Sequence, residues 1–234
     1  MSSKRLLRID GFPRIEVRTN ARARRVRVHI LPEGFTVVVP PRTSIVDVIE
    51  VMNSHRDVFL DSYEKVKKKP IAPGFSIDAP CFKLSVVEGE GVVFRLRIVD
   101  DKAVVYCPLD ADYDNAKTQM LLKNTIVRAM KRQAELLLPP LLKEWADRYD
   151  FHYRKVKING ARRRWGSCTS AGTINLSCYL LTLPSELIDY VLLHELCHTR
   201  HMNHSSDFYA LLNKVTDGNS DALNKQLKNY KPSF

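Results

Sequence analysis

The sequence predicts an α+β protein built from a β-rich N-terminal unit over residues 1–110 and a C-terminal unit over residues 111–234. Around residues 26–30, apolar and polar side chains alternate with the two-residue period of a β-strand. From Asp114 onward, apolar residues recur at the spacing of an α-helix. An apolar helical run then leads into the histidine-containing stretch 194–198, which is typical of a metal site.

The N-terminal unit is expected to contain a β-hairpin over residues 20–39. Its turn falls at residues 32–34, where proline and glycine favour a reversal of the chain, and β-branched residues follow. A helical region then begins at Thr43 or Ser44 and continues to about Lys67. An aspartate stands three positions after Ser44, which is the spacing of a capping box.

Three further strands are predicted in this unit, over residues 81–87, 92–99 and 103–107. Clusters of glycine, glutamate and aspartate separate them and are typical of turns. The unit is therefore expected to be largely β-structure with one helical insertion. The sequence shows no internal repeat and no low-complexity segment.

The C-terminal unit is predicted to begin with a long helix from Asp114. Two prolines at residues 139–140 are expected to kink or interrupt it before a further helical stretch over 141–149. The later predicted elements are two or three short strands, a helix from Pro184 to about Met202, and helices near 206–215 and 219–229. Pro184 suits a first helical position, and Ser205 can cap the next helix.

The most informative feature of the C-terminal unit is the stretch His194-Glu195-Leu196-Cys197-His198. Positions four apart lie on one face of a helix, so His194 and His198 can direct ring nitrogens at one ion. Glu195 lies beside them, where a carboxylate can act as general base for a metal-activated water. The preceding apolar run indicates a buried helix, in which an unpaired glutamate is costly. The pattern predicts a metal site with Glu195 as its catalytic residue.

The third ligand is expected to be His204, with one zinc ion per chain. A continuous helix would turn this side chain away from the other two, so the chain must leave the helix first. Residues 202–203 offer an exit, because asparagine tolerates the left-handed conformation that ends helices. His201 is the alternative, since it lies on the same helical face as His194. However, three histidines on one straight helix would spread over roughly 10 Å, which is too long for one tetrahedral centre.

An ordered series of motifs runs through residues 164–209 and carries a resemblance to a known family. The motifs are 164–168, 172–176, 183–191, 194–198, 203–205 and Phe208. With them the chain resembles the YgjP-type metal-dependent hydrolases, which are zincin-like metallopeptidase relatives akin to the SprT and Wss groups. The N-terminal hairpin and helix are similar more loosely. Tyr209 and residues 177–179 depart from the family's usual residues without changing an expected ligand.

This resemblance implies a C-terminal zincin-like domain with a zinc-binding active-site helix and a peptidase activity. The three histidines would hold zinc, and a water would fill the fourth position. Glu195 would accept the proton of that water and pass it to the leaving amine of a peptide or protein substrate. Tyr179, Tyr209 and Arg164 are each candidates for the oxyanion donor, and the sequence singles out none of them.

The predicted strand over residues 172–180 lies just before the metal helix. In the zincin-like proteins that the chain resembles, a strand in this place edges the substrate cleft, where an extended peptide can pair with free backbone groups. An ordinary interior strand fits the sequence equally well.

The net charge of +11 is concentrated near the N-terminus, where residues 1–30 carry nine basic against two acidic groups, giving +7. Such a cluster, which includes Arg22 and Arg24, can neutralise nucleic-acid phosphates. Basic and apolar residues alternate over 25–30, however, as on the solvated face of a strand. Nucleic-acid binding is therefore possible but not favoured. A second basic run, 162–164, lies closer to the expected site, where contact with substrate or phosphate is more plausible.

Two rival functions remain open on the sequence. A DNA-associated protease of the SprT or Wss type would use the basic N-terminus to hold nucleic acid. A non-catalytic zinc-containing module that binds nucleic acid or protein would instead close the fourth position with a protein ligand such as Cys168 or His201. A fourth position open to water would exclude this second rival.

The composition also predicts a compartment. No apolar run reaches the length of a membrane span, and the first eight residues lack the apolar stretch of a signal peptide. Five cysteines at scattered spacings, without a paired CxxC motif, favour free thiols over a disulfide framework. A cytoplasmic protein without membrane contact is therefore expected.

Overall fold

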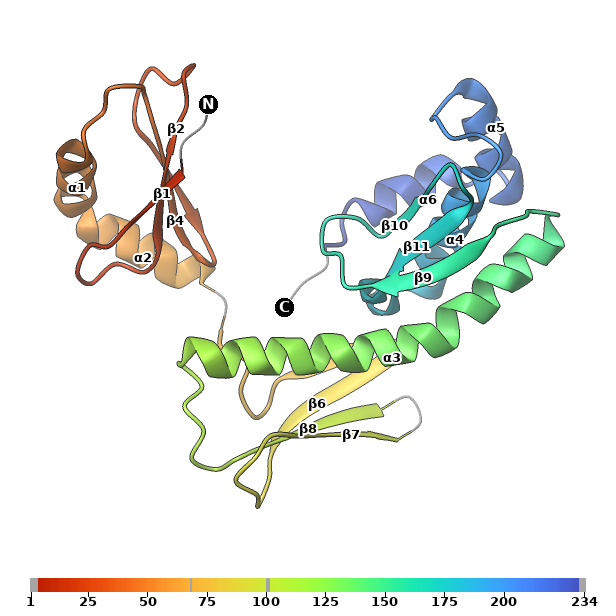
Figure 1. Ribbon diagram of the computed structural model, residues 1–234, viewed down its shortest axis with the longest axis horizontal. Helices are drawn as coiled ribbons and strands as arrows, with labels where there is room; N and C mark the ends of the chain where they lie inside the picture. The colour runs from red at the N-terminus through yellow and green to blue at the C-terminus, as the bar shows by residue number, and fades with distance from the viewer. Residues whose placement is uncertain (1–3, 68, 100–101, 232–234) are drawn as a thin grey trace. The chain divides into compact units, whose positions relative to one another are not determined.

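The computed structural model describes residues 4–67, 69–99 and 102–231, and it has the α+β class that the sequence predicts (Figure 1). Contacts divide the chain into two compact units, Met1–Lys69 and Pro70–Phe234. Each unit contains a sheet covered on one face by helices.

This division falls before the strands near residues 76–107, whereas the sequence predicted a boundary after residue 110. The physical reason is a shared core. Leu84 and Val105 on these strands belong to the same buried cluster as Ile126 on the following helix. Apolar side chains from both elements are removed from water together, so the strands pack as part of the second unit.

The first unit is a four-stranded sheet with two helices on one face. Its elements are β1 (Lys4–Leu7), β2 (Ile15–Thr19), β3 (Arg27–Leu31), β4 (Gly34–Val39), α1 (Ile45–Ser54) and α2 (Arg56–Val66). The predicted hairpin is confirmed as the antiparallel pair β3 and β4. Ser44 and Asp47 form the predicted capping box at the start of α1. The predicted single helical region is broken at His55, and β1 and β2 were not predicted.

In the second unit, a long helix covers a second four-stranded sheet. The strands are β5 (Ser76–Ala79), β6 (Phe82–Glu88), β7 (Arg95–Val99) and β8 (Lys102–Cys107), and the helix is α3 (Ala116–Arg148). The prolines at 139–140 do not interrupt α3, although the helix bends toward its C-terminal end in Figure 1. Leu138 and Leu142 are fully buried on either side of them, and this packing outweighs a proline penalty of about 3 kcal/mol.

The two four-stranded sheets share one topology. Their strand orders are β1-β2-β4-β3 and β5-β6-β8-β7, with a parallel central pair and antiparallel outer pairs in both. In the first sheet, Val28 lies opposite Val37. In the second sheet, Leu96 lies opposite Val105, and each of these residues follows its counterpart in the first sheet by the same number of positions. The sequence analysis found no internal repeat of residues, and it did not predict this shared strand order. Val37 and Val105 are both buried, and Val28 and Leu96 are both half-buried, so matched positions share their burial.

The rest of the second unit forms a mixed layer beside the C-terminal part of α3. Its elements are β9 (Lys155–Asn159), β10 (Gly166–Cys168), β11 (Thr173–Ser177), the 3-10 helix η1 (Cys178–Thr182), α4 (Ser185–Cys197), α5 (Ser206–Val215) and α6 (Ser220–Leu227). Trp145 on α3 donates a hydrogen bond of 2.8 Å from Nε1 to Asp189 on α4. This bond ties the helix that carries the histidine motif to the unit's longest helix. None of the described helices has the length and apolar character needed to cross a bilayer.

Candidate metal centre

Helix α4 presents His194 and Glu195 from its last turn, and His198 caps its end. Leu192 and Leu196 on the same helix are fully buried and fix its rotation against the core. The helix ends at Cys197, earlier than the predicted end near Met202.

The chain leaves α4 through a tight turn over residues 198–201. The amides of Arg200 and His201 both donate to the carbonyl of Cys197, at 3.1 and 2.9 Å. The Arg200 guanidinium donates to the carbonyl oxygens of Tyr149 and Asp150, at 3.2 and 2.6 Å, just past the end of α3. Contact with a distant part of the chain thus holds the turn.

The predicted left-handed exit at Asn203 is wrong. Arg42, Asp150 and Asp217 are the non-glycine residues with positive φ in the described ranges, and Asn203 is not among them. The chain instead turns directly after Cys197. Ser205 then caps α5, accepting a hydrogen bond of 3.4 Å from the Phe208 amide, as the sequence predicts. This cap sets the direction from which His204 approaches α4.

The structure brings His194, His198 and His204 together. The Nε2 atom of His194 lies 3.2 Å from Nε2 of His198 and 3.2 Å from Nε2 of His204. Their potential ligand atoms all lie within 4.8 Å of one another. A tetrahedral zinc with bonds of 2.0–2.1 Å to nitrogen needs separations of about 3.3 Å. The three imidazoles therefore fit a divalent ion of this size.

Burial favours the neutral, metal-binding form of two of these imidazoles, His194 and His198. Burial lowers the pKa of His194 to about 4, and the neighbouring His198 and His204 act in the same direction. Burial also lowers the pKa of His198. His198 Nδ1 lies 3.0 Å from the carbonyl oxygen of His201. If Nδ1 carries the proton and donates it there, Nε2 keeps a free lone pair for an ion.

The ring of Phe208, on α5, packs against all three imidazole rings. Its ring centroid lies 5.0 Å from that of His194, 4.5 Å from that of His198 and 4.8 Å from that of His204. Phe208 is fully buried, so it limits how far each imidazole can rotate. The sequence placed this residue in a motif but assigned it no role. Its role depends on the packing of α5 against α4.

Phe208→Ala is expected to lower zinc affinity by about 10-fold to 100-fold, because the three imidazoles lose the surface that orients them. Removing a buried phenylalanine should also lower Tm by about 10 °C. Competition with a coloured zinc chelator measures the affinity. Phe82→Ala is the matched control, since Phe82 is equally buried in this unit but lies on β6. Equal zinc affinities in the two variants would contradict the proposed role of the ring.

Glu195 lies beside this group but outside it. Its side chain is almost completely buried, with 5% of the residue exposed. Burial raises the pKa of Glu195 to about 8, while the Arg164 guanidinium acts in the opposite direction. Oε2 of Glu195 has no hydrogen-bond partner among the described residues, and neither has Nδ1 of His194. An unpartnered buried carboxylate oxygen is rare in folded proteins and is typical of a site that receives a ligand, a water or an ion.

The sequence offered other candidates for a metal ligand and for the oxyanion donor, and the structure places some of them nearer the histidines than others. Neither Cys168 nor His201 belongs to the described group of potential ligands. Tyr179 is only 1% exposed within the core, which disfavours it as an oxyanion donor. Tyr209 is 48% exposed and its ring stacks 6.0 Å from that of His204. Arg164 is exposed and acts electrostatically on Glu195, so these two residues are the better placed candidates.

The strand beside the site is β10 rather than the predicted strand 172–180. The strand order is β10-β11-β9, so β11 is interior and its backbone pairs on both sides. The interior-strand alternative is thus the one observed, and residues 178–182 form η1 instead of extending the strand. Strand β10 lies at the edge of this sheet and contacts α4.

Two other features of the chain lie apart from the histidines. In the first unit, Arg27 and His29 on β3 are exposed, which confirms the predicted solvated strand face, whereas Arg25 is exposed but lies before the strand. Glu16 on β2 forms ion pairs with Lys4, Arg14 and Arg18, so these three basic side chains have an acidic partner within the unit.

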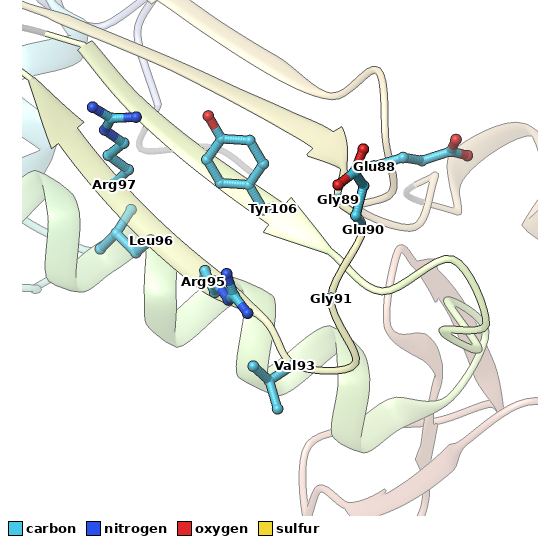
Figure 2. Close-up of a pocket in the computed structure, with 9 residues that line it drawn as sticks. All are labelled: Glu88, Gly89, Glu90, Gly91, Val93, Arg95, Leu96, Arg97 and Tyr106. Atoms are coloured by element: carbon cyan, nitrogen blue, oxygen red, sulfur yellow. The ribbon is translucent and has the colours of Figure 1, made fainter.

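In the second unit, a hollow of about 760 Å³ lies over β7, β8 and the loop between β6 and β7. Figure 2 shows Arg95, Arg97 and Tyr106 around it, with Glu88 and Glu90 at its rim. None of the residues that line it belongs to the histidine group. The hollow is therefore separate from the candidate metal centre.

Comparison with known proteins identifies the family. A family model described as YgjP-like, metallopeptidase domain, matches residues 24–230. Among solved structures, the chain is similar to the metallopeptidase zymogen abylysin of Pyrococcus abyssi, with 26% identity and a TM-score of 0.36 over 39% of this chain and 91% of that one. It is also similar to the metallopeptidase zymogen jannalysin of Methanocaldococcus jannaschii, with 21% identity and a TM-score of 0.35 over 39% of this chain and 93% of that one. No curated protein matches the chain.

The two structural likenesses cover a minor part of the chain, so the assignment depends on the family model. That model extends from the hairpin of the first unit to beyond α6, and it includes the whole histidine group. It also confirms the resemblance that the motifs of residues 164–209 carry. The chain belongs to the YgjP-like metallopeptidase family.

Proposed function

We propose that this protein is a zinc-dependent peptidase whose metal ligands are His194, His198 and His204. The observation that carries the proposal is the convergence of three imidazoles, with Nε2 of His194 3.2 Å from Nε2 of both His198 and His204, beside a buried carboxylate with an unpartnered oxygen. Imidazole nitrogens in this number suit zinc, and three protein ligands leave a fourth position for water or substrate.

In this proposal, Glu195 carries out the proton transfers. When bound at three imidazoles, a zinc ion lowers the pKa of a coordinated water and polarises a carbonyl group. The ionised carboxylate of Glu195, which the positive charge of a bound ion would favour against the effect of burial on its pKa, accepts through Oε2 the proton of the attacking water and delivers it to the nitrogen of the leaving amine. The low exposure of Glu195 keeps bulk water from competing for that proton. Peptide bonds are the substrate class that the metallopeptidase family implies.

We further propose that the free edge of β10 holds the substrate in an extended conformation. An edge strand offers unpaired backbone N–H and C=O groups to which a peptide can add as a further strand. Backbone pairing of this kind tolerates many side chains. It therefore suits an enzyme that accepts unfolded proteins or peptides of varied sequence.

Metal removal is the direct test of the proposed function. Treatment with a chelator should abolish cleavage of unfolded protein or peptide substrates, and one equivalent of zinc per chain should restore it, because the three imidazoles form a single site. Product peptides are identified by mass spectrometry, and bound metal is measured by elemental analysis. Cleavage that survives complete removal of the metal would reject the proposal.

A further inference from the structure

Gly166 lies where β10 passes close to the Glu195 side chain. A methyl group at Gly166 would lie 2.6 Å from Oε1 of Glu195, 2.7 Å from Cγ and 2.8 Å from Cδ. Non-bonded carbon atoms have their optimal separation at about 3.5–4.0 Å. Any side chain at position 166 would therefore displace the Glu195 side chain from its present place.

The backbone at this position does not itself need glycine. The described glycines with positive φ are Gly11, Gly34, Gly74, Gly172 and Gly218, and Gly166 is not one of them. It instead pairs with Leu176 in an ordinary antiparallel ladder. Glycine within a strand weakens that strand and often marks a close approach by another group. Here the group that approaches is a buried glutamate.

Glu195 has little freedom to avoid such a contact. It is 5% exposed, and its neighbour Leu196 is fully buried in the core. The hydrogen bond from Trp145 holds α4 at Asp189, before Glu195. The contacts of Arg200 hold the chain just after the helix ends. Moving the carboxylate would require a new rotamer inside a packed interior, which is costly.

We infer that Gly166 is a positioning residue: the absence of a side chain there determines where the Glu195 carboxylate lies relative to the three histidines. The catalytic part of this inference depends on the proposed function, whereas the contact between Gly166 and Glu195 does not. A double-mutant cycle separates the two parts.

Gly166→Ala is expected to lower Tm by about 5 °C in the natural sequence, because it overpacks the space that Glu195 fills. In a Glu195→Ala background the same change should shift Tm by less than about 2 °C, since the three clashing atoms are absent. If Gly166→Ala alone does not fold, the double variant should still fold. Equal losses of Tm in both backgrounds, or a double variant that fails to fold, would overturn the inference.

Activity provides the second readout. Gly166→Ala should keep its zinc while kcat falls by about 100-fold with little change in KM, because a misplacement of about 1 Å is enough to disable a catalytic group. The matched control is Gly160→Ala, where the added methyl group would meet Val127 and Lys131 at 3.2 and 3.3 Å, away from Glu195. The control should retain kcat. An unchanged kcat in Gly166→Ala would refute the positioning role, and an inactive natural protein would refute the proposed function while leaving the Tm test valid.

Discussion

Glu195→Gln is expected to retain zinc and to lose peptidase activity by at least about 100-fold, since the glutamine amide cannot accept a proton from water. The substitution preserves the size of a side chain that is 5% exposed, so the fold and the three imidazoles should remain in place. Elemental analysis gives the zinc content, and initial rates on an unfolded protein substrate give the activity.

The matched control is Glu186→Gln, which makes the same chemical change in the first turn of the same helix. Glu186 is exposed and belongs neither to the histidine group nor to the contact with β10, so its variant should keep full activity. Loss of zinc in Glu195→Gln would make Glu195 a ligand. Full activity in that variant would instead remove Glu195 from the mechanism.

His204→Ala is expected to lose most of its zinc, with affinity reduced by more than about 100-fold, because removing a direct ligand costs more than removing an outer contact. The distance of 3.2 Å between the Nε2 atoms of His204 and His194 is the reason to expect a shared ion. Elemental analysis after dialysis, followed by competition with a zinc chelator, measures the loss.

His201→Ala is the corresponding control, and the structure explains why it should retain zinc. His201 interacts with His198 through its backbone carbonyl oxygen, at 3.0 Å from Nδ1, and an alanine keeps that oxygen. The imidazole of His201 lies outside the group of potential ligands. If His201→Ala loses zinc and His204→Ala retains it, the third ligand is His201 and the proposed site must be revised.

Signals confined to a few neighbouring residues predicted the local structure well. The alternation of basic and apolar residues over 25–30 predicted the strand face, and Ser44 predicted the start of α1. Ser205 predicted the cap of α5. Each signal depends on contacts within one turn or one strand, where the spacing of residues in the sequence determines their spacing in space. The choice of His204 over His201 as a ligand remains a prediction, although the structure brings His204 to the group.

Predictions that required knowledge of distant contacts were less successful. The end of α4 at Cys197 depends on Arg200 reaching Asp150, and the continuity of α3 through its prolines depends on the packing of Leu138 and Leu142. The shared topology of the two sheets was also missed, because strand order depends on pairing between segments far apart in the chain.

The sequence by itself predicted the chemistry that we propose for this protein: two histidines four positions apart, an adjacent glutamate and a third histidine downstream suffice to predict a metal site. Only the tertiary structure decided how that chemistry is arranged. It packed Phe208 against the imidazoles and brought Gly166 against the Glu195 carboxylate. It also placed β10, rather than β11, at the edge of the sheet that contacts α4. Residue identity sets which atoms can bind an ion or move a proton, whereas their distances and burial depend on packing between elements that are far apart in the sequence.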